Sequence, residues 1–209
     1  MEILKSFRLI LVILFFGYST IFSKGQNVSE IINAFQESYI YEASGNYQKA
    51  INVLKKVYDE KSYEINLRLG WLTYQSGLFT ESLAFYNNAI SQMPMSIEAR
   101  YGYAYPASAL GNWDQVIRQY EKILEITPNN TITNHRLGLI YYGREEYDKA
   151  YRYFEKVVNI YPFDYDGLIM LAWTNYKLNR TREAKVLFQK ALMHTPGGAS
   201  ALEGLDLLK

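Results

Sequence analysis

Four prolines recur at an interval of 34 residues, and this register constrains the fold more than any other feature of the chain. They are Pro94, Pro128, Pro162 and Pro196. Gly77 and Gly111 keep the same interval. A strict period of this length indicates supersecondary units that bury their apolar faces by stacking on one another. The sequence therefore predicts a repeat protein.

Within each period the apolar residues follow helical spacing. An aromatic residue follows the turn in four units, at Tyr47, Phe79, Trp113 and Tyr147. A second aromatic residue or a leucine comes seven positions later, at Leu54, Tyr86, Tyr120 and Phe154. Small residues lie between the large ones and let neighbouring helices approach closely, among them Gly70, Ala104, Gly138 and Ala172. Each unit is thus predicted to be two helices joined by a short turn.

These residues resemble the tetratricopeptide repeat (TPR) family, whose pattern is W-x2-L-G-x2-Y, then A-x3-F, then P. The clearest units are LGWLT with the run that ends at Pro94, and LGLIY with the run that ends at Pro162. The resemblance implies an all-α protein, a right-handed α-solenoid of helix-turn-helix repeats. Its repeats are expected at residues 31–62, 63–96, 97–130, 131–164 and 165–198.

Two segments lie outside the repeats. Residues 199–209 form an amphipathic stretch that is expected to cover the last repeat as a capping helix. Residues 1–25 have basic, apolar and small-polar parts in the order of a signal peptide. The apolar run of about 14 residues spans roughly 21 Å, which is less than the roughly 30 Å of a bilayer core. We expect cleavage before Gln26, leaving a TPR domain at 26–198; a retained anchor or a buried first helix are the alternatives.

Export predicts a periplasmic or secreted protein that is soluble after cleavage. The chain has no cysteine, so neither disulfides nor thiol chemistry contribute. Loss of residues 1–25 changes the formal charge from +1 to −1, because it removes three cations and one anion. A near-neutral chain gives no basis for nucleic-acid binding. Membrane contact is expected only through an uncleaved signal segment.

In the TPR family the first helices of successive repeats line a concave groove. On this sequence that resemblance implies an aromatic partner-binding stripe at Tyr39, Trp71, Tyr74, Tyr101, Tyr105, His135, Tyr142, Trp173 and Tyr176. Each of these residues could instead belong to the core. The carboxylate clamp of some family members is missing, since Phe35, Tyr39, Arg68, Glu98 and Gly102 occupy its positions. Arg68 and Arg136 are expected either to pair with nearby acids or to hold an acidic group.

The sequence favours a non-catalytic scaffold or adaptor that binds a protein or peptide in this groove. The two histidines, His135 and His194, lie in different repeats, and no phosphate loop or nucleophile elbow is present. No metal, cofactor or catalytic residue is therefore predicted. A self-associating structural protein and a cell-wall glycan-binding module are the alternatives. Pro106, inside a predicted helix, is either a tolerated kink or a device that widens the groove.

Overall fold

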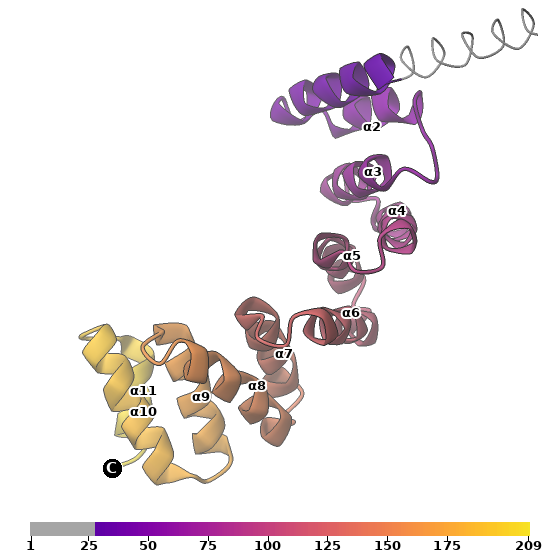
Figure 1. The fold of residues 1–209 in the computed structure, drawn as a ribbon. Coiled ribbons are helices and arrows are strands. Elements are labelled where there is room, and N and C mark those ends of the chain that lie inside the picture. Colours follow the sequence, from indigo (N-terminus) through magenta and orange to yellow (C-terminus); the bar gives the residue numbers. More distant parts are fainter. Residues whose placement is uncertain (1–27) are drawn as a thin grey trace, which may run out of the picture. The chain divides into compact units, whose positions relative to one another are not determined.

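The computed structural model describes residues 28–209, and every regular element in that range is a helix (Figure 1). The predicted all-α class of helix-turn-helix repeats is confirmed for this range. The predicted signal peptide and its cleavage position lie outside the described residues. Among residues 28–209, no helix combines the length and the apolar character needed to cross a bilayer.

The chain divides into two compact units, of which the first ends at Gly111. The described part of this N-terminal unit comprises a helix over residues 28–43, α2 (Tyr47–Lys55), α3 (Tyr63–Gln75), α4 (Phe79–Gln92) and α5 (Ile97–Ala109). Its core includes a cluster in which Ala34 and Leu54 pack with Leu69 and Leu72. Three helices therefore share one apolar interior.

The C-terminal unit runs from Asn112 to Lys209. It comprises α6 (Trp113–Ile126), α7 (Thr131–Gly143), α8 (Tyr147–Ile160), α9 (Tyr165–Lys177), α10 (Thr181–His194) and α11 (Ala199–Asp206). The helices α3, α5, α7, α9 and α11 begin 34 residues apart. Phe188 and Ala201 belong to one buried cluster, so α11 packs on the hairpin that precedes it.

The first helices of the second to fifth repeats, α3, α5, α7 and α9, begin with a side-chain cap. Ser62, Ser96, Asn130 and Asp164 each accept a hydrogen bond from the backbone N–H three residues later. These caps satisfy one of the backbone donors that a helix start leaves free. The second helices α4, α6, α8 and α10 have no such side-chain bond. The polar residue two positions after Pro94, Pro128 and Pro162 thus caps the helix that begins the next repeat.

A buried polar side chain four residues after each of the first three caps holds the preceding loop. Asn66 Nδ2 donates to the carbonyls of Glu60 (2.8 Å) and Ser62 (2.7 Å). In the next repeats Arg100 Nη2 donates to the Pro94 carbonyl at 2.6 Å, and Asn134 Nδ2 donates to the Pro128 carbonyl at 3.2 Å. The proline register therefore coincides with a loop that is hydrogen-bonded to the following helix.

The turns within the repeats require a positive φ at one position. Gly77 and Gly111 supply it with φ of 79° and 72°. At the same position of the last two repeats, Glu145 and Asn179 adopt φ of 61° and 59°. The left-handed backbone conformation thus occurs also where the residue is not glycine. It costs about 1 kcal/mol of conformational free energy, and the cost is smaller for asparagine than for glutamate.

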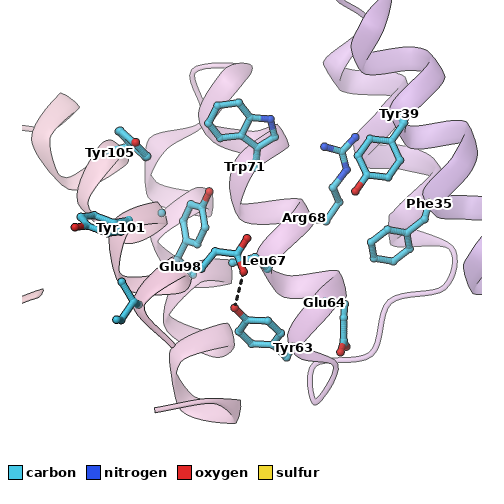
Figure 2. A pocket seen from close by; sticks show the side chains of 13 residues that line it. Phe35, Tyr39, Tyr63, Glu64, Leu67, Arg68, Trp71, Glu98, Tyr101 and Tyr105 are labelled. Atoms are coloured by element: carbon cyan, nitrogen blue, oxygen red, sulfur yellow. Dashed lines mark hydrogen bonds between the residues drawn. The ribbon is translucent and has the colours of Figure 1, made fainter. Parts of the chain in front are cut away.

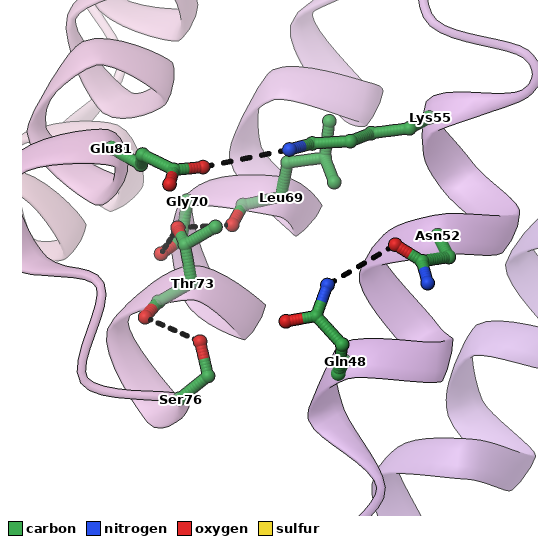
Figure 3. A network of polar contacts seen from close by, with 8 residues as sticks. All are labelled: Gln48, Asn52, Lys55, Leu69, Gly70, Thr73, Ser76 and Glu81. Carbon is green, nitrogen blue, oxygen red and sulfur yellow. Dashed lines mark hydrogen bonds and ion pairs between the residues drawn. The ribbon is translucent and has the colours of Figure 1, made fainter.

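Polar contacts occur within α3 and between α2 and α4 (Figure 3), and a further one joins α4 to α3. Thr73 Oγ1 donates to the Leu69 carbonyl at 2.6 Å, and Ser82 Oγ on α4 donates to the Gly70 carbonyl at 2.7 Å. Across the helices, Lys55 Nζ lies 3.5 Å from Glu81 Oε2. The Ser82 hydroxyl thus links α4 to α3, whereas the ion pair between α2 and α4 contributes little, because both of its charged side chains are about half exposed.

Aromatic rings pack directly against glycines where helices cross. A Cβ atom on Gly102 would lie 2.1 Å from the Tyr86 ring, and one on Gly70 would lie 2.9 Å from it. Gly138 faces Phe154 and Gly204 faces Phe188 in the same way, at 2.6 and 2.2 Å. These distances are shorter than any contact between non-bonded carbon atoms, so the fold needs glycine at these positions.

Candidate functional site

The N-terminal unit holds a cavity of about 870 Å³ (Figure 2). The helix over residues 28–43, α3, α4 and α5 contribute its walls. Four predicted groove residues line it, namely Tyr39, Trp71, Tyr101 and Tyr105. The remaining lining residues are Phe35, Tyr63, Glu64, Leu67, Arg68, Tyr86, Ile97, Glu98 and Gly102.

Arg68 is anchored at one side of this pocket. Its side chain is 9% exposed, and its Nη2 lies 2.6 Å from Glu42 Oε2. The guanidinium carbon lies 3.9 Å from the centroid of the Tyr39 ring, and Nε donates to Ser38 Oγ at 3.2 Å. Of the two roles expected for Arg68, pairing with a nearby acid is the one that the structure contains.

Glu42 also fixes the indole of the pocket. Its second carboxylate oxygen, Oε1, accepts a hydrogen bond from Trp71 Nε1 at 2.5 Å. One carboxylate therefore holds both Arg68 and Trp71, which are both on α3. Because these side chains are already ordered, a ligand in the pocket would lose little free energy in arranging them.

A row of aromatic rings continues from Trp71 across α3 and α5. Tyr74 lies 6.0 Å from Trp71 and 5.6 Å from Tyr105, measured between ring centroids. Tyr74 also contacts Phe79, at 5.9 Å. Tyr74 does not line the cavity but supports two residues that do, which places the fifth predicted groove residue of this unit beside the pocket.

Glu98, in the first turn of α5, is one of the charged residues that line the pocket. Its Oε2 accepts a hydrogen bond from the Tyr63 hydroxyl at 3.3 Å, and that hydroxyl also contacts Ser96 Oγ at 2.8 Å (Figure 2). Burial, followed by the Glu98 charge, raises the pKa of Tyr63, so the hydroxyl stays protonated as a donor at neutral pH. Glu98 and Glu64 are both exposed.

The other four predicted groove residues belong to the C-terminal unit. Trp173 Nε1 donates to Ser200 Oγ at 2.8 Å, and its ring lies 5.0 Å from Phe188 and 5.7 Å from Tyr176. Trp173 and Tyr176 thus pack against the core cluster beneath α11. Tyr142 lies 5.3 Å from Tyr147, an edge-to-face contact across the α7–α8 turn.

His135, the remaining predicted groove residue, packs edge-on against the buried Phe154 ring at 5.6 Å. Among the described residues its buried Nε2 has no hydrogen-bond partner. Burial lowers the pKa of His135 from its ordinary value near 6.5, an effect that Asp166 and Asp164 oppose only in part. The neutral imidazole is therefore the form that the folded chain accommodates.

We expect the stability of the chain to fall between pH 7 and pH 5 in a way that depends on His135. The unfolded state takes up a proton near pH 6.5, whereas the folded state does so only at lower pH, so acidification favours unfolding until the folded-state pKa is passed. Urea unfolding at pH 7.5, 6.5 and 5.5 should give a shallower pH dependence for His135→Gln than for the parent chain. The same change at the exposed His194 serves as control, and an equal effect of both substitutions would contradict the prediction.

Glu42, Ser38 and Tyr63 are site residues that the sequence did not single out. The resemblance to the TPR family identifies Glu98 only as a position where a clamp residue is missing. Its spacing from Tyr101 and Tyr105 is three and seven residues, which places all three on one helix face and is the signal that could have found it. No group of three or more acidic or histidine side chains within residues 28–209 is arranged to hold a metal ion.

Tetratricopeptide repeat family models match residues 34–62 and 133–164. The TPR repeat-containing protein YpiA of Bacillus subtilis is 25% identical over 181 residues, which are 85% of this chain and 43% of that protein. Among solved structures, a TPR protein from Parabacteroides merdae superposes with a TM-score of 0.73 at 19% identity, covering 86% of this chain and 72% of the other. The MamA protein superposes with a TM-score of 0.70 at 22% identity, covering 79% and 91%.

These matches and the 34-residue helical hairpins identify the chain as a tetratricopeptide repeat protein. The TPR fold supports, in general, a protein–protein interaction scaffold. The chain spans less than half the length of the curated relatives that it matches, with 43% of YpiA and 15% of the human protein O-mannosyl-transferase TMTC1.

Proposed function

We propose that this TPR protein is a non-catalytic adaptor that binds an extended protein segment in the pocket of its N-terminal unit. The observation that carries the proposal is the cavity of about 870 Å³ with aromatic walls. Such a volume falls in the range of ligand-binding pockets, and its apolar walls with a few polar groups have the usual composition of such sites. Trp71 and Arg68, fixed by Glu42, give the walls a definite shape.

The same proposal includes export and the lack of catalysis. Export is supported by the signal-like composition of residues 1–25. An adaptor role is supported by the pocket side chains, which offer aromatic rings and carboxylates but no nucleophile beside a base. The likeness to TMTC1 covers 15% of that protein.

The pocket also presents accessible aromatic side chains that can serve as anchors for a partner. Tyr39 and Tyr105 are 55% and 39% exposed, so their rings are accessible on opposite sides of the pocket. A well-buried apolar anchor contributes about 1.5–3 kcal/mol, from which the ordering costs of binding are subtracted.

We expect the full chain, used as bait in an extract of its source cell, to capture a specific protein that Tyr39→Ala/Tyr105→Ala fails to capture. The matched control is Tyr161→Ala, which removes a tyrosine of equal exposure (56%) outside the pocket. Circular dichroism would establish equal helicity of all three baits before mass spectrometry of the captured proteins. Equal capture by the pocket variant and the control would rule out the pocket as the partner site.

Self-association is a second candidate that one observation favours. Exposed apolar side chains lie near the ends of α8 and α10, where Phe163 and Met193 are 52% and 73% exposed, and the Phe163 ring lies 5.1 Å from the His194 ring. Light scattering of the pure chain at increasing concentration tests this function directly. A large stable assembly that Phe163→Ser/Met193→Ser disperses would favour it over a free adaptor.

A further inference from the structure

Tyr86 of α4 passes between α3 and α5 and carries its hydroxyl to the N-terminal pocket. The near end of its ring packs against Gly70 of α3, since a Cβ atom there would lie 2.9 Å from Cγ. The far end packs against Gly102 of α5, since a Cβ atom there would lie 2.5 Å from Cζ, the carbon that bears the hydroxyl. Tyr86 is 3% exposed, and both Tyr86 and Gly102 line the cavity. The small accessible part of this side chain therefore faces the pocket.

The Tyr86 hydroxyl forms no hydrogen bond within residues 28–209. Burial raises the pKa of this hydroxyl, and the neighbouring Tyr105, Glu98 and Tyr74 raise it further, so the proton stays in place at neutral pH. Native proteins rarely keep a buried donor without an acceptor, because the loss of its water costs free energy that no contact returns. An acceptor supplied by a ligand in the pocket would remove this cost.

The equivalent side chains of the later repeats leave no hydroxyl unbonded. Tyr120, which lies 34 residues after Tyr86, accepts a hydrogen bond from Arg136 Nη1 at 3.3 Å. Arg136 occupies the position that Gly102 has in the preceding repeat. The last two repeats have phenylalanine in place of the tyrosine. Tyr86 is therefore the member of this series that brings a hydroxyl to a glycine, which has no side chain to bond it.

The surroundings of the hydroxyl favour a neutral acceptor. Glu64 and Glu98 line the same cavity, whereas the cation of its lining, Arg68, is already paired with Glu42. A carboxylate ligand would therefore meet like charges, which cost binding free energy. A carbonyl oxygen carries no net charge. Every residue of an extended protein segment brings one, and that oxygen needs a donor when it loses its water in a pocket with apolar walls.

We propose that Tyr86 Oη donates a hydrogen bond to a main-chain carbonyl of an internal, extended partner segment, whose apolar side chains pack against Phe35 and Trp71. This inference rests on the proposed function, since it specifies how the pocket holds the segment. A main-chain contact does not depend on which residue carries the carbonyl, so the sequence preference comes from the aromatic and apolar walls. The carboxylates of the lining disfavour a segment that ends in a free C-terminal carboxylate.

The first test is the stability of Tyr86→Phe without a ligand. The substitution removes only the hydroxyl, and Phe154 and Phe188 show that phenylalanine fits against a glycine at this position. The full-length variant should unfold at the same or a higher urea concentration than the parent, because no hydrogen bond is lost. Tyr120→Phe, which removes a bonded hydroxyl, should unfold at a lower one. A lower midpoint for Tyr86→Phe would contradict the proposal, since the hydroxyl would then have a partner within the chain.

The second test uses twelve-residue peptides from a random phage library, selected on the full-length parent and rejected by Tyr39→Ala/Tyr105→Ala. Their synthetic, C-terminally amidated forms should bind Tyr86→Phe about tenfold more weakly than the parent. Tyr161→Phe, which removes an exposed hydroxyl outside the pocket, should bind them unchanged. At one peptide bond, replacing the amide with an ester, whose carbonyl is a weaker acceptor, should weaken binding to the parent but not to Tyr86→Phe, because both changes act on one contact.

The outcomes separate this inference from the proposed function. Pocket-dependent peptides that bind Tyr86→Phe as tightly as the parent would overturn the inference and leave the adaptor function standing. Ester effects of equal size in both chains would do the same, since the hydroxyl would then not bond the main chain. A selection that yields no peptide dependent on Tyr39 and Tyr105 would overturn both.

Discussion

Gly138→Leu is expected to lower the free energy of unfolding of the C-terminal unit by about 3 kcal/mol, the upper end of the usual cost of overpacking. A Cβ atom at this position would lie 2.6 Å from Phe154 Cε1, and leucine adds three further carbons. Phe154 is fully buried between the helices, so its ring has no free space to move into. Urea unfolding followed by circular dichroism measures the change.

A second glycine of the same helix provides the control. Gly143 is the last residue of α7, and no atom lies within 4 Å of the Cβ that would be added there. Gly143→Leu should leave stability unchanged or raise it by up to about 1 kcal/mol, because leucine favours the helix over glycine. Truncating the ring with Phe154→Ala should recover part of the loss in the Gly138→Leu background. Equal destabilisation by the two leucines would show that the ring contact is not the cause.

Glu42→Ala is expected to destabilise the N-terminal unit by about 2–3 kcal/mol. It leaves the guanidinium of Arg68 buried without its counterion and the indole N–H of Trp71 without its acceptor. Removing one partner of a buried ion pair costs about 3–5 kcal/mol, and we place the loss below that range because the Glu42 side chain is 24% exposed and water partly replaces it. Chemical denaturation with Trp71 fluorescence reports on the same region.

An exposed ion pair of the same unit separates this effect from general loss of charge. Glu81→Ala breaks the Lys55–Glu81 pair, whose side chains are 47% and 49% exposed, and should cost less than about 0.5 kcal/mol. The double change Glu42→Leu/Arg68→Met should recover most of the loss, since it removes both charges together. If Glu42→Ala proved as mild as Glu81→Ala, Arg68 would have to be hydrated in the fold and the pocket wall would not be fixed.

The fold follows from the sequence because its determinants are periodic. The prolines, the turn glycines and the small residues recur every 34 positions, and helices α3, α5, α7 and α9 begin with that spacing. Even where the pattern fails, the backbone keeps it, as the positive φ of Glu145 shows. The helices and turns can be predicted from such a local pattern without knowing where each side chain points.

The site depends on side-chain surroundings, which the period does not determine. Trp71 and Trp173 occupy the same position of their repeats, 102 residues apart. Trp71 donates back to Glu42 of the preceding repeat and lines a cavity, whereas Trp173 donates forward to Ser200 and packs on the core beneath α11. The sequence therefore predicts a nine-residue groove stripe, and four of these residues line the pocket together. Which members these are depends on the neighbours of each repeat.

The contact of the Tyr86 ring with Gly102 limits which repeats can be deleted or exchanged during evolution. The position that receives the ring of the preceding hairpin is glycine at 102 and 204, but arginine at 136, where Nη1 instead donates to the Tyr120 hydroxyl at 3.3 Å. Excision of residues 97–130 would preserve the period and yet set Tyr86 against Arg136. The junctions at Gly102 and at Arg136 thus have different matched pairs, so these hairpins share a backbone but cannot replace one another, and their order along the chain must be conserved with their side chains.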